Sequence, residues 1–455
     1  MRVMFAVFPA TAHFFPMVPH AWALRNAGHE VRVVTVPGTP TGVATPDFAS
    51  KIAEAGLSAT TCGRSQPLSV MDGAAPELVP TMEGSEFYAR HLALSPGERH
   101  IWDVFYHFLL TTVRNYHPLR PRQDVTALVD FARDWRPDLV LWDPWFPSGA
   151  VAARACGAAH ARVLNALDYS AWVGRRFDEV RAHGGEVPEN PLVETLRPLA
   201  EKYGFTPDKE LLYGQWTIDP FPEAMRLPTG APTVPVRHTP FNGGGVVPDW
   251  LRDRPEIPRV VISLGVSTRD FNRKDWGRTA ALVEAVSGLD VDVVATLNGN
   301  QLEDVRGSLP GNVRAVDYVP LSQLLPGASA IVHHGANGTF AAAVEAGVPQ
   351  LVCDTDEYPR FVGEIDGGSV AWKLLCQKQI TATPIAEHVA RHGAGLRLNH
   401  QTQSVEEIRD RIREVVRDRS YARGAERLRR EWADAPSPAA IVPTLERLAS
   451  EHRSG

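Results

Sequence analysis

The chain has few of the features that mark several large protein classes. Among its 455 residues are only four cysteines, Cys62, Cys156, Cys353 and Cys376, and none forms a Cys-x-x-Cys pair. This scarcity argues against a zinc cluster or a disulfide framework and is typical of a reduced intracellular protein. No apolar run reaches the ~18–20 residues that a spanning helix needs, and no signal peptide precedes the first strand. We therefore expect a cytoplasmic protein without a transmembrane segment.

The chain also lacks an excess of positive charge and the common nucleotide-binding motifs. Its formal net charge is -6 and it has no long Lys/Arg run, so nucleic-acid binding is not expected. No Gly-x-Gly-x-x-Gly follows the first strand of either half, and no Gly-x-x-x-x-Gly-Lys-Ser/Thr occurs. These absences weaken dehydrogenase and P-loop interpretations.

What the sequence does contain is an α/β pattern that starts twice. The apolar runs 2–8 and 30–36 flank a helical stretch, and the pattern begins again with the run 259–264. Strand, helix and strand at this spacing predict a parallel sheet in each half. The segment between the halves is rich in Pro and Gly and is the best linker candidate. We assign residues 1–225 to a first Rossmann-like domain, 226–258 to a linker, 259–432 to a second Rossmann-like domain and 433–455 to a C-terminal helix.

The second half contains a candidate anion site in the sequence VHHGANGT, residues 332–339. It lies between an apolar strand-like run and an alanine-rich helical run, where an α/β domain exposes backbone N–H groups and the positive end of a helix dipole. Both features suit a phosphate. An ordinary strand-turn-helix junction, with its glycines serving the turn, would have the same local sequence.

The first half contains a candidate general base, His13, and an acidic partner for it, Asp143. Each follows a predicted strand, so both are expected at the carboxyl edge of the same sheet, where open α/β sheets bind ligands. A histidine that acts as a base usually needs a carboxylate to orient it. Taken singly, His13 could be a loop hydrogen-bonder and Asp143 a helix cap.

Taken together, these residues and their surroundings resemble the GT-B glycosyltransferases that attach deoxysugars to polyketides in actinobacterial antibiotic biosynthesis, and most of all their activator-dependent group. The resemblance covers nearly the whole chain. Its marks are His13, VPHAWALRNAGHEV (18–31), WRPDLVLWDP (135–144), GAAHARVL (157–164), GQWTID (214–219), VVPDWLR (246–252), LGVSTR (264–269), YVPLSQLLP (318–326) and VHHGANGT (332–339).

The resemblance implies two Rossmann-like domains facing each other across a cleft, with the C-terminal helix packing back on the first domain. An aglycone would bind the first domain and a dTDP-deoxysugar the second. Transfer would be inverting and independent of a metal or any other cofactor, with His13 as base and Asp143 as its partner. The residues implied for the nucleotide sugar are Ser267, His333, Gly338 and Thr339 at the diphosphate, Tyr318 and Val319 at the nucleobase, and Asn337 at the sugar.

The chain departs from this family in the segment after Cys353. Relatives carry a short loop with a Trp-Asp pair whose acid touches the sugar, whereas the segment here is longer, from Asp354 to Pro384. Asp354, Asp356 and Asp366 are all candidates for that acid, and we select Asp356. The lengthened segment would reshape the sugar pocket or the acceptor entrance.

The resemblance also implies partners. Members of the group often need an auxiliary protein resembling a cytochrome P450 without its haem, and the insertion at residues 64–122, with an aromatic helix at 101–113, would be its docking surface. The alternative is that these aromatic side chains line the core or the acceptor pocket. A homodimer is a further expectation. Two other functions stay open: a nucleotide-sugar 2-epimerase or hydrolase, and a catalytically degenerate GT-B partner protein.

Overall fold

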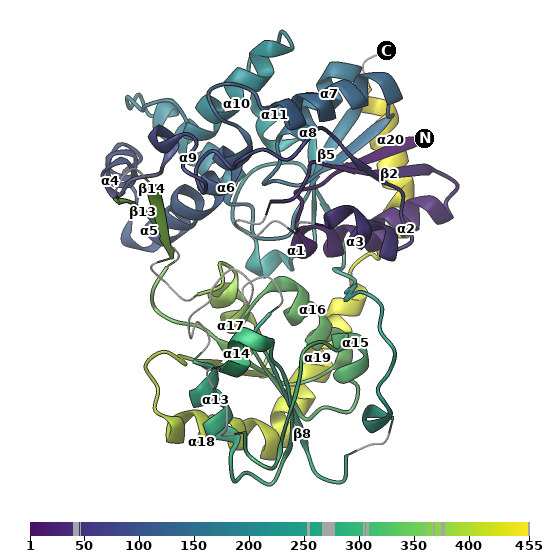
Figure 1. The fold of residues 1–455 in the computed structure, drawn as a ribbon, viewed down its shortest axis with the longest axis vertical. Coiled ribbons are helices and arrows are strands. Elements are labelled where there is room, and N and C mark those ends of the chain that lie inside the picture. Colours follow the sequence, from purple (N-terminus) through teal and green to yellow (C-terminus); the bar gives the residue numbers. More distant parts are fainter. Residues whose placement is uncertain are drawn as a thin grey trace.

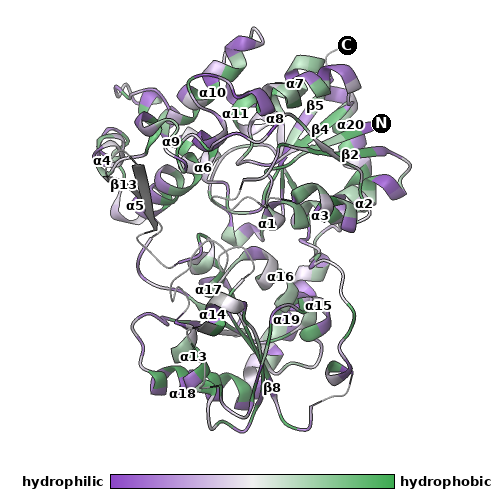
Figure 2. Cartoon of the chain, viewed as in Figure 1, coloured by the Kyte–Doolittle hydropathy of each residue, from purple (hydrophilic) through white to green (hydrophobic). Residues whose placement is uncertain are grey.

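The computed structural model describes residues 1–39, 45, 47–252, 255–265, 278–303, 305, 309–358, 360–366, 369–374 and 378–453. The chain forms two lobes, each with a parallel sheet at its centre and helices on both faces of the sheet (Figure 1). Hydrophobic residues concentrate along the central strands of each lobe (Figure 2). Sheets covered on both faces require such apolar strands, and the predicted α/β class is confirmed.

The first lobe holds a sheet of seven described strands in the order β3-β2-β1-β4-β5-β6-β7, and every pairing is parallel. Runs of Val, Leu and Phe make these strands, and β4 is buried at all four positions because helices cover both its faces. The strands are β1 Arg2–Ala6, β2 Glu30–Thr35, β3 Ala59–Thr61, β4 Leu139–Trp142, β5 Ala159–Val163, β6 Trp216–Asp219 and β7 Thr233–Pro235.

The last strand of this sheet lies beyond the predicted domain boundary at residue 225. β7, Thr233–Pro235, falls inside the segment 226–258 that the sequence assigns to the linker. It is short and ends in proline, which is tolerated because β7 is an edge strand. The part of the linker that joins the lobes therefore begins after Pro235.

Helices cover both faces of the first sheet. An almost continuous helical segment runs from Pro96 to Tyr116 and includes a π-helical stretch, Val104–Leu109, between α5 and α6. The helices of this lobe are α1 Thr11–Phe14, α2 Val18–Asn26, α3 Phe48–Glu54, α4 Met82–His91, α5 Pro96–Asp103, α6 Leu110–Tyr116, α7 Gln123–Trp135, α8 Ser148–Cys156, α9 Tyr169–Ala182, α10 Pro191–Lys202 and α11 Lys209–Tyr213. Short 3-10 turns lie at Phe15–Met17, Pro76–Leu78 and Glu223–Met225.

The second lobe repeats the architecture with a six-stranded parallel sheet in the described residues, ordered β10-β9-β8-β11-β12-β15. An antiparallel hairpin of β13 and β14 projects from it toward the first lobe, near α4 and α5 in Figure 1. The strands are β8 Arg259–Ser263, β9 Asp292–Thr296, β10 Val313–Val316, β11 Ala330–His333, β12 Gln350–Cys353, β13 Phe361–Asp366, β14 Ser369–Leu374 and β15 Gly395–Leu398. The helices are α13 Thr279–Val286, α14 Gly299–Glu303, α15 Leu321–Leu324, α16 Asn337–Ala346, α17 Ala382–Arg391, α18 Val405–Arg417 and α19 Arg419–Asp434.

The C-terminal helix α20, Val442–His452, returns to the first lobe (Figure 1). Its apolar residues Val442, Leu445 and Ala449 are buried in the same hydrophobic cluster as Val3 and Phe5 of β1. Burying three such side chains stabilises the junction of the lobes by several kcal/mol, at about 1–3 kcal/mol each. Within the described part of the chain, no helix has the length and apolarity to cross a membrane.

Candidate active site

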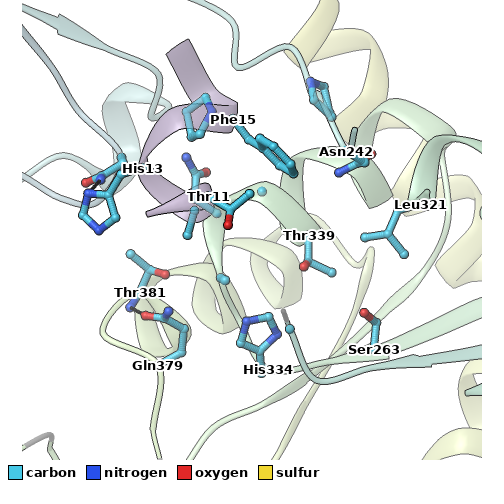
Figure 3. Close-up of a pocket in the computed structure, with 18 of the residues that line it drawn as sticks. Thr11, His13, Phe15, Asn242, Ser263, Leu321, His334, Thr339, Gln379 and Thr381 are labelled. Atoms are coloured by element: carbon cyan, nitrogen blue, oxygen red, sulfur yellow. Dashed lines mark hydrogen bonds between the residues drawn. The ribbon is translucent and has the colours of Figure 1, made fainter. Parts of the chain in front are cut away.

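A cavity of about 220 Å³ lies between the two lobes and is lined by both of them and by the linker (Figure 3). From the first lobe it takes Thr11, His13, Phe15, Phe108, Trp145 and Asn165. From the linker and the second lobe it takes, among others, His238, Asn242, Ser263, Tyr318, Val319, Leu321, His334, Asn337, Gly338, Thr339, Gln379 and Thr381.

The strand order of each sheet determines where the cavity forms. In the first sheet β1 lies between β2 and β4, so the chain connections leave β1 and β4 in opposite directions. In the second sheet the same reversal occurs between β8 and β11. Ligands in open α/β sheets bind at the carboxyl ends of strands at such reversals. His13 follows β1, Asp143 follows β4, Gly265 follows β8 and His334 follows β11, so the two reversals face each other across the cavity.

The structure brings His13 and Asp143 into contact. His13 Nδ1 lies 2.7 Å from Asp143 Oδ2, and the carboxylate is completely buried. The backbone N–H of Trp145 donates to the other carboxylate oxygen, at 2.9 Å, and fixes the Asp143 side chain. The His13 ring is also held by Trp145, whose ring centroid lies 4.4 Å away. With Nδ1 occupied by the carboxylate, Nε2 is the nitrogen left for a substrate proton.

Asn165, which the sequence analysis did not identify, contacts the same nitrogen. It follows β5 and places its amide 2.5 Å from His13 Nδ1. One Nδ1–H can be shared by a carboxylate and an amide oxygen, so the two contacts are compatible when the amide presents its oxygen. A half-turn of the amide gives that arrangement, since its two heavy atoms are interchangeable in shape. Asn165 is then a positioning residue that keeps the proton on Nδ1.

The role of Asn165 predicts a specific loss of rate. Asn165→Ala should lower kcat about tenfold, the equivalent of one hydrogen bond of about 1–1.5 kcal/mol, and should leave unchanged the KM of the nucleotide sugar that the resemblance implies. Asn165→Asp keeps an oxygen at the same place and should stay within a few-fold of the wild type. The measurement is steady-state kinetics of both variants. Equal kcat values for the alanine variant and the wild type would remove Asn165 from the site.

The two adjacent histidines of the second lobe have different environments. His333 ends β11 and is completely buried behind the cavity, with Nε2 3.0 Å from Gln350 Oε1 and Nδ1 accepting from the N–H of Gly335 at 3.1 Å. His334 instead lines the cavity. Burial lowers the pKa of His333 to about 3 and that of His334 to about 4. The resemblance assigned the diphosphate to His333, whereas the structure brings His334 to the cavity.

Gly265 makes room for the His334 ring. Its φ of +87° is in the left-handed region, and a side chain there would collide with the imidazole. The Leu-Gly pair at the end of β8 and the His-His pair at the end of β11 are thus parts of one arrangement.

The helix that follows, α16, points its N-terminus into the cavity. Asn337, Gly338 and Thr339, which the resemblance assigns to the nucleotide sugar, line the cavity. The N-cap position is Ala336, which provides no side-chain cap, so the first N–H groups remain available to a ligand. A Cβ added at Gly338 would meet nothing within 4 Å, so the backbone here is open to a close approach. An uncapped helix N-terminus with this space is a suitable anion site.

Tyr318 and Val319 line the same cavity on the side of the linker. The Tyr318 hydroxyl donates to the backbone carbonyl of Asn242. Phe241 of the linker meets Phe15 of the first lobe edge to face, with ring centroids 5.1 Å apart. The linker is therefore a wall of the cavity, a role that its irregular sequence did not reveal.

The remaining predicted site residues are Ser267 and Asp356. Ser267 lies outside the described residues. The Asp356 side chain is 78% exposed and pairs with Arg397 at 2.6 Å, so it does not line the cavity. Asp354 is fully buried and pairs with Lys378 at 2.9 Å and with Arg397 at 2.8 Å. The lengthened segment instead brings Gln379 and Thr381 to the cavity. The Thr381 hydroxyl donates to the Gly335 carbonyl at 2.7 Å and holds the segment there.

The aromatic helix of the 64–122 insertion faces inward. Trp102, Phe105 and Tyr106 are buried in the core of the first lobe, and Phe108 lines the cavity. Of the two interpretations of these aromatic residues, the structure supports the core and pocket lining. The exposed aromatic residue of the described insertion is Phe87 on α4, at 41% exposure.

Comparisons with known proteins agree with this arrangement. Two family profiles match nearly the whole chain: the N-terminal domain of the erythromycin biosynthesis protein CIII-like family at residues 22–265, and its C-terminal domain at 280–362 and 374–448. The chain is 38% identical over 464 residues to the aclacinomycin-T 2-deoxy-L-fucose transferase of Streptomyces galilaeus, covering 100% of this chain and 97% of the relative. It is also 38% identical over 460 residues to the 10-deoxymethynolide desosaminyltransferase of Streptomyces venezuelae, covering 100% and 98%.

Solved structures share the fold over its full length. The glycosyltransferase VinC in complex with dTDP aligns with a TM-score of 0.75 at 32% identity and covers 99% of this chain and 100% of VinC. The spinosyn forosaminyltransferase SpnP aligns with a TM-score of 0.74 at 34% identity and covers 99% of both chains.

Proposed function

The chain belongs to the erythromycin biosynthesis protein CIII-like family and is a glycosyltransferase of the GT-B fold, and from this premise we propose that it moves a deoxysugar from a dTDP-sugar to a polyketide aglycone. The observation that carries the proposal is that His13, held by the buried Asp143, lines the cavity into which the uncapped N-terminus of α16 points. Support for the donor comes from the dTDP bound to VinC. Support for the acceptor comes from relatives named for 10-deoxymethynolide, aklavinone and tylactone.

The proposed reaction is a single displacement with inversion. His13 Nε2 accepts the proton of an acceptor hydroxyl while that oxygen bonds to the anomeric carbon, and the bond from this carbon to the diphosphate oxygen breaks. Asp143 holds Nδ1–H and stabilises the imidazolium that forms. The dTDP leaves with the bonding electron pair.

The leaving diphosphate would be stabilised without a metal by hydrogen-bond donors and a helix dipole. No Lys or Arg lines the cavity among the described residues. The donors nearest to the helix N-terminus are the N–H groups of Gly338 and Thr339, the Thr339 hydroxyl and the His334 imidazole. Burial keeps the pKa of His334 at about 4, and the negative charge of a bound diphosphate favours its protonated form.

The remaining lining residues would hold the other parts of the donor. The nucleobase stacks on Tyr318 beside Val319, next to the linker wall at Asn242. Asn337 faces the sugar, and its Oδ1 is buried with no hydrogen-bond partner among the described residues, as expected of a group that binds a ligand hydroxyl. Gln379, rather than an acid, is the neighbouring group from the lengthened segment.

The two adjacent histidines provide a test of this donor site. His334→Ala should weaken dTDP binding about ten- to hundredfold, because a hydrogen bond to a charged group contributes about 1.5–3 kcal/mol. His333→Gln changes a side chain that does not line the cavity, so its dTDP affinity should stay within a few-fold of the wild type. Calorimetric titration with dTDP measures both. A larger loss for His333→Gln would contradict the assignment.

The activity itself is tested by incubating the wild type with dTDP-deoxysugars and an aglycone panel. The expected product is one glycoside of inverted configuration. Release of an altered free sugar without glycoside would support an epimerase or hydrolase instead. Failure to bind any dTDP species would support a catalytically degenerate protein.

The partners form part of the proposal as well. A cytochrome-P450-like auxiliary protein and a homodimer are proposed from the family resemblance. An auxiliary protein would contact exposed residues such as Met82 and Phe87 of α4, because the other aromatic residues of the 64–122 insertion named above are covered. Size-exclusion chromatography coupled to light scattering measures the state of the chain alone.

A further inference from the structure

A second cavity, of about 310 Å³, lies next to the first. The partition between them is formed by Tyr169 and Ile380, and Ile380 lines both cavities. The Tyr169 hydroxyl donates to the Ile380 carbonyl at 2.7 Å, so one hydrogen bond between the two lobes closes the partition. Leu167, on the second cavity, is only two residues from Asn165, which contacts His13 in the first. The two cavities are therefore neighbours along the wall that carries the base.

The second cavity has an apolar side and a polar end. Its apolar side comes mostly from the first lobe and consists of Ile101, Val104, Leu167, Ala224, Met225 and Leu227. The opposite wall is the lengthened segment and α17, where Tyr358 stacks on His100 with ring centroids 4.7 Å apart. The polar end carries Lys378, Glu387 and Arg391 and also His388, which is 4% exposed and whose Nδ1 has no hydrogen-bond partner within the described ranges. Burial lowers the pKa of His388 to about 4, so it is a neutral hydrogen-bonding group.

Size distinguishes the roles of the two cavities. A pocket for one drug-sized ligand measures about 300–1,000 Å³. The first cavity, at about 220 Å³, would have to hold the donor and the reacting part of the acceptor together. The linker, Tyr318 and α16 line its nucleotide side, so a large acceptor needs further space next to the first cavity. The second cavity is that space.

We propose that the second cavity receives the distal part of the aglycone, a large apolar molecule with a few oxygen atoms, while its reacting hydroxyl lies at His13. This inference rests on the proposed function and adds a site to it. The apolar side covers the carbon skeleton, and His388 bonds to a hydroxyl or ketone oxygen at the far end. The Tyr169–Ile380 contact opens to let the molecule extend across both cavities. The lengthened segment of the donor lobe thereby selects the acceptor.

The test fills the second cavity from an exposed position. Ala224 is exposed on the turn Glu223–Met225 and lines the cavity, so Ala224→Phe adds a ring there with little risk to folding. Leu227→Trp fills the cavity from a second position. The matched control is Glu223→Phe, which adds the same ring on the same turn at an exposed residue that does not line the cavity. Calorimetry measures the binding of aklavinone, 10-deoxymethynolide and dTDP to each protein.

The inference expects both filled variants to bind an aglycone at least about tenfold more weakly than the Glu223→Phe control, with dTDP affinity unchanged in all of them. Wild-type aglycone affinity in Ala224→Phe and Leu227→Trp would overturn the inference and leave the proposed function standing. A wild type that binds dTDP but neither aglycone would refute the proposed acceptor class, and the second-cavity inference with it.

Discussion

Replacement of His13 by alanine is expected to lower the rate of sugar transfer by about 10²–10⁴-fold, the usual contribution of a general base. The acceptor hydroxyl would then have to lose its proton to water within a cavity where the base has been removed. The dTDP affinity should not change, because His13 lies on the first lobe and the proposed diphosphate donors lie on the second. Single-turnover transfer and calorimetric dTDP titration on the same preparation measure the two quantities.

Asp143→Asn tests the partner of His13 in the same way. An asparagine has the shape of the aspartate but no charge to stabilise the imidazolium, and it can present an N–H to Nδ1 and favour the wrong tautomer. A large loss of kcat with an unchanged donor KM is expected here too. The double variant should be little worse than either single variant, since residues acting as one unit are non-additive. Transfer at the wild-type rate by His13→Ala would exclude this histidine as the base.

The His13–Asp143 pair could be anticipated because it depends on a general property of parallel sheets. Each residue directly follows an apolar strand, and the carboxyl ends of parallel strands lie on one edge. The sequence did not specify that β1 and β4 are neighbours. Because they are, His13 Nδ1 and Asp143 Oδ2 lie only 2.7 Å apart on the shared edge of the sheet. Asn165 was missed because nothing local distinguishes an asparagine after β5 from an ordinary loop residue.

The choice between His333 and His334 could not be made from sequence. The side chains of adjacent residues at the end of a strand point to opposite sides. Which side faces the cavity depends on tertiary packing that the two residues themselves do not determine. His333 points to Gln350 of the neighbouring strand, so His334 points to the cavity. Gln379 was missed for a different reason. A hairpin, β13–β14, separates it from Cys353, and the resemblance implied an acid, so only the aspartates of the segment were considered.

The contribution of the linker was also hidden. His238, Phe241 and Asn242 show no periodicity, and their contacts are with residues far along the chain, such as Phe15 and Tyr318. His238 Nδ1 lies 3.3 Å from the Asn337 amide at the start of α16. Only the arrangement of the two lobes makes a connecting segment into a wall of the cavity.

Acid is expected to unfold this protein at an unusually mild pH, because many of its histidines are buried as neutral groups. Burial lowers the pKa to about 4 or about 3 at eight of them: His20, His107, His117, His160, His238, His333, His334 and His388. Between pH 6.5 and 4 the unfolded chain binds protons that the folded chain excludes, so stability falls as the pH falls through this window. At pH 5.5 each such group costs about 1.4 kcal/mol.

Several of these costs together approach the total stability of a typical domain, about 5–15 kcal/mol. Asp219 acts in the opposite direction, because burial raises its pKa to about 6 and the folded chain gains a proton there, but it offsets only one histidine. We therefore expect most of the free energy of unfolding to be lost between about pH 6.5 and 5. Urea titrations followed by circular dichroism across this range measure the loss.

The slope of the unfolding free energy against pH identifies the histidines that cause the acid sensitivity. This slope can be compared between proteins even when a variant is less stable overall. His160→Asn removes a buried histidine on β5 that does not line either cavity, and it should reduce the slope near pH 5.5 by about 1.4 kcal/mol per pH unit, the equivalent of one proton. His183→Gln is the control, because it removes an exposed histidine just after α9. Its slope should match the wild type. Equal slopes for all three proteins would show that burial of His160 does not exclude a proton.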